Sequence, residues 1–500
     1  MRCHARDSFG GCQMSVRYGL LVAAGLSAIC MGCTGVHHSA NMAEAEVRAA
    51  MTIPFTAACA PVSSAPSPVV PDLAGPKPVE HYVSFALGQN PRIQAARMRV
   101  QAAAMRVPQA GSLKDPILSV NGWPFFPNTP QTAAGRMTTD VMVSQEVPWR
   151  GKRPLRAAAA QAEVREAQAK LAAVEFQTIE EVKLAYFELY YIQRAIDITQ
   201  YDGTILSDLV VLANSMFSVG RVSQQDVLRL QAERDNVEVE LVRLRQAMAS
   251  SQAELARILG VSPETPLLAV AELPADSVGY DLELLYHQAI AVRPELQAML
   301  AQVQRNRRQI DLARLNYYPD ITLRAGWGDI TTSRAIAPSA NGNDNVAIGL
   351  SMNLPLYRDR LTAAVREAES ATAAAARDYD ELKNATQRDI KRLFTEATAQ
   401  QELEILFRES ILPKTSQALQ VAISGYEVGE TEFADLIANW RELLRFQLNH
   451  LRIQTQLRQS LASLERVVGG LPSQQPDPQA DAPDLDMLPS PENAGSLPPL

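Results

Sequence analysis

The chain carries the same break in a helical sequence twice, and this duplication constrains its fold more than any other feature. The stretches FSVGRVSQQDVL (217–228) and YEVGETEFADLI (426–437) each contain an aromatic residue, Val-Gly, and an Asp six residues after the Gly. Other matched positions keep the same order, with offsets that rise only from 203 to 209: Pro91 with Pro294, Pro116 with Pro319, Gly122 with Gly326, Pro148 with Pro355, and Gly260 with Gly469. This order predicts two copies of one unit, 80–260 and 282–470, joined by a connection at 261–281.

Each copy is predicted to contain the same elements. A helix comes first, two short alternating stretches follow, and a very long helix is then separated from a last helix by the Val-Gly break. The predicted helices are 80–111, 152–217 and 222–259 in the first copy, and 282–316, 359–427 and 431–468 in the second. At 1.5 Å per residue the long helix reaches roughly 100 Å. We therefore expect a tall helical cylinder; an ordinary coiled-coil rod would not account for the alternating stretches.

Those four stretches alternate apolar and polar residues, as strands with one apolar face do. NVAIGLSMNL (345–354) and DITLRAGWG (320–328) are the clearest, while TTDVMVSQEV (138–147) and ILSVNGW (117–123) are weaker. A soluble sheet capping the helices would alternate in the same way, but an exported chain favours a membrane barrel. Four strands cannot close a barrel, and hydrocarbon does not tolerate an open sheet edge. Several chains must share the barrel, and three would supply twelve strands.

Both ends of the chain differ from its body. Residues 1–33 are predicted to be an export signal, with a true start possibly at Met14, and Gly32-Cys33 is similar to the end of a lipoprotein signal. We expect Cys33 to be lipidated; cleavage nearby without lipid is the alternative. The Pro/Ser-rich segment 34–79 and the Pro/Asp-rich tail 471–500 are expected to be flexible, since neither can bury enough apolar surface to offset its ordering entropy.

Composition and motifs argue against several functions. The 47 Lys and Arg against 55 Asp and Glu leave a formal charge of −8, which provides no electrostatic reason to expect nucleic acid as a partner. All five cysteines lie at or before Cys59, so they cannot build a metal site in the body. No phosphate-binding loop, HExxH or GxSxG motif is present, and the body of the chain after Cys59 has no CxxC motif. We expect a protein that is not an enzyme and has neither a cofactor nor a metal site.

The doubled order of NPRIQAA, QEVPWRGKR and the two Val-Gly stretches resembles the TolC family of outer-membrane efflux channels over nearly all of 80–470. The resemblance implies an α+β membrane protein in the bacterial outer membrane. Long α-helical hairpins would form a periplasmic tunnel, and four strands per chain would contribute to the twelve-stranded β-barrel of a homotrimer. It also implies a periplasmic adaptor (a membrane fusion protein) and an inner-membrane pump as partners, besides outer-membrane lipid.

The same resemblance assigns roles at the break. Val219, Gly220, Val428 and Gly429 would form the periplasmic tips that contact the adaptor. Asp226 corresponds to an acid that hydrogen-bonds Tyr426 of the other hairpin, and Asp435 to an acid that lines the narrowest ring, so these three would form the gate. A second ring acid and a locking Arg of the family fall at Ala438 and Thr431, which implies a weaker lock. The alternative is that Asp226 and Asp435 are solvated acids at helix N-termini.

The cargo is only weakly indicated. QEVPWRGKR and the overall spacing are most similar to the heavy-metal branch of the family, the CusC- and CzcC-like channels that serve pumps of the RND type. Export of multiple drugs or aromatic compounds is the second interpretation. A periplasmic helical adaptor is a third, but it should have one hairpin between unrepeated β domains.

Overall fold

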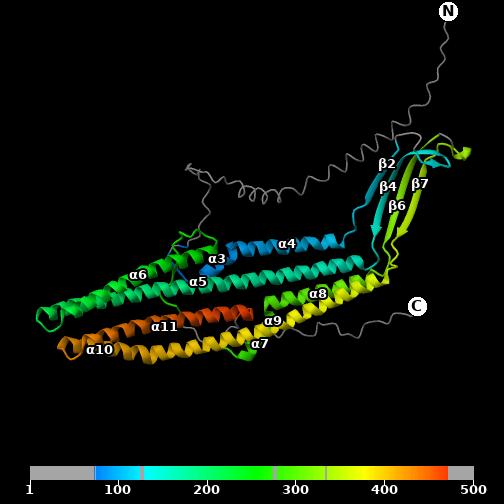
Figure 1. Cartoon of the computed structure of the whole chain (residues 1–500). Helices are drawn as coiled ribbons and strands as arrows, with labels where there is room; N and C mark the ends of the chain where they lie inside the picture. Colours follow the sequence, from blue (N-terminus) through cyan, green and yellow to red (C-terminus); the bar gives the residue numbers. More distant parts are fainter. Residues whose placement is uncertain (1–72, 74, 124–128, 274–278, 333–334, 471–500) are drawn as a thin grey trace, which may run out of the picture. The chain divides into compact units, whose positions relative to one another are not determined.

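The computed structural model describes residues 73, 75–123, 129–273, 279–332 and 335–470. The duplicated order predicted from the sequence is present in it (Figure 1). The first repeat contains α3 (Val79–Gln89), α4 (Pro91–Gly111), β2 (Ile117–Gly122), β4 (Gly135–Val147), α5 (Lys152–Ser218) and α6 (Gln224–Leu259). The second contains α7 (Leu282–Val292), α8 (Pro294–Leu315), β6 (Ile321–Thr331), β7 (Asn345–Met352), α9 (Arg358–Leu406), the π-helical η3 (Phe407–Ile411), α10 (Leu412–Val428) and α11 (Phe433–Val468).

The first helix of each repeat differs from the expectation of one continuous helix over 80–111 and 282–316. The chain leaves helical geometry at Asn90, with ψ 123°, and at Arg293, with ψ 119°, and a new helix starts at the following proline. A proline ring disfavours helical geometry in the residue before it but suits the first turn of a helix. Asn90 also caps α4, because its side-chain oxygen accepts a hydrogen bond of 2.8 Å from the Arg92 N–H.

The long helix of the second repeat is also interrupted, whereas α5 runs without a break for 67 residues. Between α9 and α10 lies the five-residue π-helix η3, and Pro413 follows immediately within the first turn of α10. A proline inside a helix lacks the N–H for its own hydrogen bond, and its ring collides with the carbonyl four residues earlier. The wider π turn is one of the distortions that commonly accompany such a conflict. The predicted helix over 359–427 is therefore present, with one π-helical turn inside it.

The four predicted strands form one antiparallel sheet in the order β2–β4–β6–β7. The short β3 (Gln131–Thr132) pairs only with β4, and the 3-10 turn η2 (Pro338–Ala340) lies between β6 and β7. Since each strand is antiparallel to its neighbour, the two edge strands β2 and β7 also run in opposite directions. Within the described residues, none of the helices combines the length and apolarity needed to cross a membrane.

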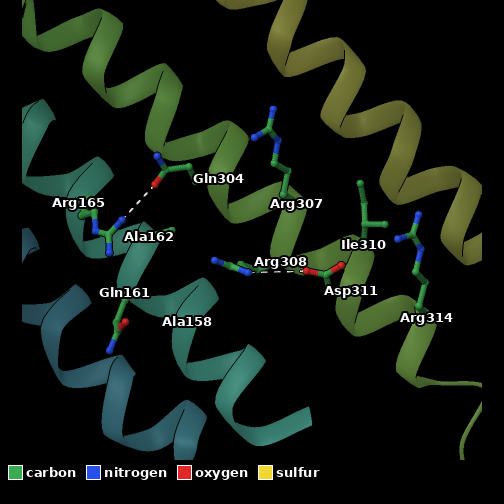
Figure 2. Close-up of a pocket in the computed structure, with 10 residues that line it drawn as sticks. All are labelled: Ala158, Gln161, Ala162, Arg165, Gln304, Arg307, Arg308, Ile310, Asp311 and Arg314. Carbon is green, nitrogen blue, oxygen red and sulfur yellow. Dashed lines mark hydrogen bonds and ion pairs between the residues drawn. The ribbon is translucent and has the colours of Figure 1, made fainter. Parts of the chain in front are cut away.

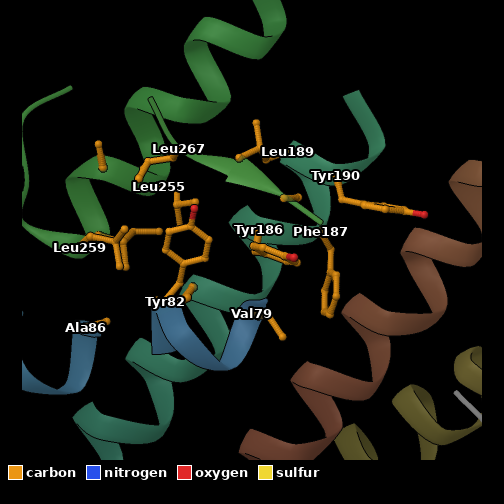
Figure 3. Close-up of a cluster of buried hydrophobic side chains, with 14 of the residues drawn as sticks. Val79, Tyr82, Ala86, Tyr186, Phe187, Leu189, Tyr190, Leu255, Leu259 and Leu267 are labelled. Atoms are coloured by element: carbon orange, nitrogen blue, oxygen red, sulfur yellow. The ribbon is translucent and has the colours of Figure 1, made fainter. Parts of the chain in front are cut away.

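A buried cluster holds α3, α5 and α6 together around two tyrosines (Figure 3). The hydroxyl of Tyr82 donates to the Leu268 carbonyl at 3.0 Å, and that of Tyr186 donates to the Lys77 carbonyl at 3.0 Å. These bonds fix a parallel pair that the sequence did not predict, between β1 (Pro76–Lys77) and β5 (Leu268–Ala269). Strand pairing thus extends into residues that we had assigned to a flexible segment and to a connection.

The second repeat has a matching cluster at equivalent positions. Leu285 and Ala289 stand where Tyr82 and Ala86 stand in the first repeat, 203 positions earlier. Val467 and Val468 match Ile258 and Leu259, 209 positions earlier. The offsets read from prolines and glycines therefore also hold for core positions. The offset is 203 at the start of each repeat and 209 at its end. The difference in length between the repeats therefore lies between the first helix and the end of the last helix.

Candidate functional site: the hairpin tips and the apolar sheet face

The two Val-Gly stretches fold into the same turn. Gly220 has φ +75° and Gly429 has φ +86°, in the left-handed region that glycine adopts at low cost. In the first turn the Arg221 N–H donates to the Met216 carbonyl at 2.9 Å. In the second the Glu430 N–H donates to the Gly425 carbonyl at 2.8 Å. Both bonds close a Schellman motif, which satisfies carbonyls at a helix end. The sequence repeat is thus a repeated backbone reversal.

The helices that leave the two turns are capped differently. Ser223 forms a capping box with Asp226: the Asp226 N–H donates to the Ser223 hydroxyl oxygen at 3.2 Å, and the Asp226 carboxylate accepts from the Ser223 N–H at 3.3 Å. Glu432 begins α11 without a side-chain cap. A capping box satisfies two otherwise unpaired N–H groups and anchors the helix start. The first turn therefore leads into a more firmly fixed helix than the second.

The two tips lie together. Asp226, Tyr426 and Gly429 line one pocket of about 590 Å3. Below it, a single buried cluster draws on both hairpins, with Met216 and Val227 from the first and Tyr426 and Trp440 from the second. An ion pair between Arg441 and Glu233 joins α11 to α6. Apolar packing and charge pairing therefore hold the two hairpins side by side in one chain.

The predicted hydrogen bond between Asp226 and Tyr426 is not formed. The Asp226 carboxylate accepts from the Ser223 hydroxyl at 2.7 Å, while the Tyr426 hydroxyl is buried and has no hydrogen-bond partner among the described residues. Burial raises the pKa of Tyr426, and the nearby Asp226 carboxylate raises it further. The two groups are thus close enough to interact electrostatically. The Asp226 carboxylate, however, caps α6 by bonding Ser223 instead of accepting the expected hydrogen bond from the Tyr426 hydroxyl.

The other predicted tip residues differ in their exposure. Val219 and Val428 are exposed large apolar side chains beside the turn glycines. Asp435 and Ala438 are exposed in the first turns of α11, and no hydrogen bond or ion pair is formed by the Asp435 carboxylate among the described residues. Thr431, at the position of the family's locking Arg, packs against Gly425, where an added Cβ would lie 2.2 Å from its hydroxyl oxygen. Thr431 therefore tightens its own turn.

The register of the sheet gathers apolar side chains on one face. Trp327 lies beside Val346, Ala325 beside Ile348, and Leu323 beside Leu350. Directly opposed residues of antiparallel strands share a face. The same row continues through Val141 and Val143 of β4 into β2. We call this surface the apolar band; it consists of Leu118, Val120, Val141, Val143, Leu323, Ala325, Trp327, Val346, Ile348 and Leu350.

The apolar band is not covered by any other part of the described chain. Ile348 is 89% exposed and Val346 is 73% exposed. The opposite face carries small and polar residues such as Ser119, Arg324 and Ser351. A contiguous exposed apolar surface of this kind marks an interface with protein or lipid.

Strand and helix meet at a buried ion pair in the predicted basic stretch QEVPWRGKR. Lys152, at the start of α5, is 2% exposed, and its Nζ lies 2.8 Å from Asp320 Oδ1 just before β6. The Trp149 N–H donates to the same oxygen at 2.7 Å. Burial alone would raise the pKa of Asp320, but the hydrogen bonds from Lys152 and Trp149 outweigh it and hold the pKa below its ordinary value. This pair ties the first repeat to the second where both enter the sheet.

Asp202 is a site that sequence reasoning missed. It lies in the middle of α5 and is 1% exposed, and within the part of the chain that the structure describes neither carboxylate oxygen has a hydrogen-bond partner. Burial raises the pKa of this carboxyl to about 6. A single acid in a long helix resembles any solvated surface acid, so only packing could reveal it.

Two predictions are not tested by the geometry. Cys33 and the export signal lie outside the described residues. Among the described residues, no three His, Cys, Asp or Glu side chains are grouped as they would be to hold a metal ion.

Comparison with known proteins matches both repeats to one family. A family model described as "Outer membrane efflux protein" matches residues 82–261 and 285–470. The cobalt-zinc-cadmium resistance protein CzcC of Cupriavidus metallidurans is 23% identical over 80% of this chain and 92% of its own length. The outer membrane protein TolC of Vibrio cholerae is 23% identical over 63% of this chain and 73% of its own length.

The fold has a close counterpart among solved structures. The outer membrane protein VceC of Vibrio cholerae matches with a TM-score of 0.66 at 22% identity, covering 78% of this chain and 96% of that chain. At this identity the likeness concerns the fold. It agrees with the predicted fold class of long helical hairpins joined to a sheet.

Proposed function

Since this chain belongs to the outer membrane efflux protein family, we propose that it is the outer-membrane exit channel of a tripartite system that exports heavy-metal cations. Its family makes it a transport protein of the outer membrane and not an enzyme. The observation that carries the proposal is the joint presence of an uncovered apolar band at one end of the repeats and paired reversals at the other. One end suits lipid, and the other offers two similar tips to a partner.

We propose that three copies assemble. Among the described residues, the sheet β2–β4–β6–β7 ends in two edge strands, β2 and β7, that run antiparallel to each other. Edge β7 of one copy can therefore pair with edge β2 of the next in the antiparallel sense used throughout the sheet. Three four-stranded sheets would close twelve strands without a free edge, as hydrocarbon requires. The apolar band would then face lipid, and the polar face would line the lumen.

The proposed partners follow from the tips. Three chains would present six reversals, and the exposed Val219 and Val428 would provide apolar contacts for a periplasmic adaptor. An inner-membrane pump of the RND type would drive transport, since a passive channel has no energy source. A lipid on Cys33 would add an anchor. Mass spectrometry of the mature N-terminus tests that part, and an unmodified start elsewhere would remove the anchor from the proposal.

Heavy metals are proposed as cargo because the similarity to CzcC extends over 80% of this chain. The test is a strain without its own channels that expresses this chain with the adaptor and pump encoded beside it. We expect lower cell content of cobalt, zinc or cadmium, measured by elemental mass spectrometry, and no change in drug tolerance. Unchanged metal content with increased tolerance of drugs or aromatic compounds would instead favour the second interpretation.

We propose that Asp435 lines the narrowest ring. A ring of three exposed carboxylates would concentrate cations at the tip. Asp435→Asn should then reduce the cation preference of the reconstituted channel in planar-bilayer recordings. Asp378→Asn removes the charge of an acid in a different helix, α9. It serves as the charge-matched control and should leave the cation preference unchanged. Equal selectivity of Asp435→Asn and the parent chain would reduce Asp435 to a solvated acid at a helix start.

A further inference from the structure

Helices α5 and α8 enclose a groove that is rich in arginine (Figure 2). Arg165 of α5 and Arg307, Arg308 and Arg314 of α8 are among the residues that line it. Asp311 is the single acid among the residues that line the groove, so the lining carries a net charge of +3. The groove measures about 690 Å3. It is a concave cationic surface on a chain whose formal charge is −8.

The arginines of the groove are poorly neutralised. Arg165 donates a hydrogen bond to the neutral side chain of Gln304 at 3.1 Å. Arg308 is 3.9 Å from Asp311, which is too long for a hydrogen bond. Arg314 is paired with Glu369 of α9 at 3.1 Å, and Arg307 has no carboxylate within ion-pair distance among the described residues. The groove therefore has guanidinium groups that could pair with an anionic ligand.

A segment of this same chain has the complementary charge. Residues 471–500 contain no Lys, Arg or His and five acids: Asp477, Asp481, Asp484, Asp486 and Glu492. Three of these acids fall within DAPDLDML (481–488), where they alternate with apolar residues. Ile310 contributes an apolar side chain to the groove. Carboxylates would pair with the guanidinium groups, which favour bidentate geometry, while Leu485 could cover the apolar part.

The length of the segment is sufficient. It starts next to Gly470, whose carbonyl accepts a hydrogen bond from Gln288 of α7 at 2.7 Å. The adjacent Gly469 packs against Arg293, the residue that caps α8. From there Arg307 is 14 residues along α8, about 21 Å at the helical rise. The 14 residues from Gly470 to Asp484 can span up to about 46 Å when extended.

We propose that the acidic segment 481–488 binds in the arginine groove between α5 and α8 of its own chain. Since α5 belongs to the first repeat and α8 to the second, the bound segment would act as an ionic strap across the two repeats. The site lies within one chain, so it depends neither on the cargo nor on the adaptor.

The test places the photo-crosslinking amino acid p-benzoylphenylalanine at Leu485 of the full chain purified in detergent. After irradiation, mass spectrometry should find crosslinks to 158–165 or 304–314. The double variant Arg307→Glu with Arg308→Glu should lower their yield by about fivefold or more, because it reverses two of the charges that hold the segment. The yield should also fall in 1 M NaCl, where the screening length is about 3 Å.

A matched double variant, Arg377→Glu with Arg392→Glu, reverses two exposed charges of α9 outside the groove and should leave the yield unchanged. Charge reversal of the segment itself, Asp484→Arg with Asp486→Arg, should restore crosslinking to the groove variant. This rescue keeps the test decisive if the groove variant perturbs local packing. Crosslinks spread over the chain, or a yield that neither the groove variant nor salt changes, would overturn the proposal.

Discussion

Buried ionisable side chains are treated in two opposite ways within α5. At its start, the ammonium group of Lys152 is buried against the Asp320 carboxylate and both charges are paired. Halfway along, the Asp202 carboxyl is equally buried and has no partner. A paired buried charge can be tolerated, whereas an unpaired buried carboxylate is strongly unfavourable. Burial therefore raises the pKa of such a carboxyl and favours its neutral form. Asp202 is therefore a residue that lowers the stability of the chain at neutral pH.

The destabilising effect of Asp202 depends on pH. The folded pKa of Asp202 is about 6, above the value near 3.9 for an unfolded Asp. The contribution of Asp202 to the free energy of unfolding is therefore greatest at low pH, where its carboxyl is protonated. It falls as the pH rises from about 4 through 6. Asp202→Asn should raise the free energy of unfolding at pH 7.5 by about 2–3 kcal/mol, with a gain that shrinks steadily from pH 6 to pH 4. Thermal unfolding at several pH values measures it.

Asp208→Asn provides the control, because Asp208 lies in the same helix and is exposed. It should alter the apparent melting temperature little and without this pH dependence. A gain for Asp202→Asn that is constant with pH would show that the carboxyl is not held neutral by burial.

At the level of elements, the two reversals are the features on which the hairpins depend. An added Cβ at Gly220 or Gly429 would meet no atom within 4 Å, so space is not the reason for glycine at these positions. The reason is the positive φ, which costs an L-residue about 1–2 kcal/mol. The neighbouring hydrogen bonds, from Arg221 and Glu430, require that geometry.

Gly220→Ala and Gly429→Ala should therefore loosen the tips without unfolding the hairpins. We expect the amides of Arg221 and Glu430 to exchange with solvent about fivefold faster in the corresponding variant, as a cost of about 1 kcal/mol implies. Hydrogen-exchange mass spectrometry of tip peptides measures this. Gly88→Ala is the matched control: this helical glycine of α3 also has open space around its Cβ but no positive φ, and its replacement should not increase exchange. Unchanged tip exchange in both variants would contradict the proposed turn mechanics.

At the level of the whole molecule, the apolar band and the open edges of the sheet make one chain incomplete. If three chains close a barrel in lipid, native mass spectrometry of detergent-extracted protein should find a trimer. Ile348→Asp places a charge on the apolar band and should reduce the trimer recovered from membranes severalfold. A charge on the lipid face of a strand is destabilising near mid-membrane, by about 2–4 kcal/mol for Arg or Lys and by less for Asp.

Ser351→Asp introduces the same charge on the opposite face of β7 and should be much milder, because the proposed lumen is wet. Equal loss in both variants would indicate that both faces are packed against protein. A folded monomer as the main species of the parent chain would contradict the shared barrel.

The sequence by itself determined the repeat, the order of elements and the apolar faces of the strands. These are carried by local signals: glycines at the reversals, prolines and glycines at matched offsets, and alternation within strands. These features need no knowledge of which side chains touch across the fold. That Asp226 and Tyr426 would lie close together was implied by the resemblance to the TolC family.

The tertiary structure decided what local signals cannot. Burial of Asp202 depends on helices far away in sequence, and the pairing of β1 with β5 joins residues on either side of the whole first repeat. The carboxylate of Asp226 could have accepted a hydrogen bond from either Tyr426 or Ser223, and it accepts one from Ser223, which is nearer in sequence at the helix start. Likewise, the arginines of α5 and α8 form a groove only because the two repeats pack side by side. Such outcomes depend on competition between contacts, and only the packed chain resolves that competition.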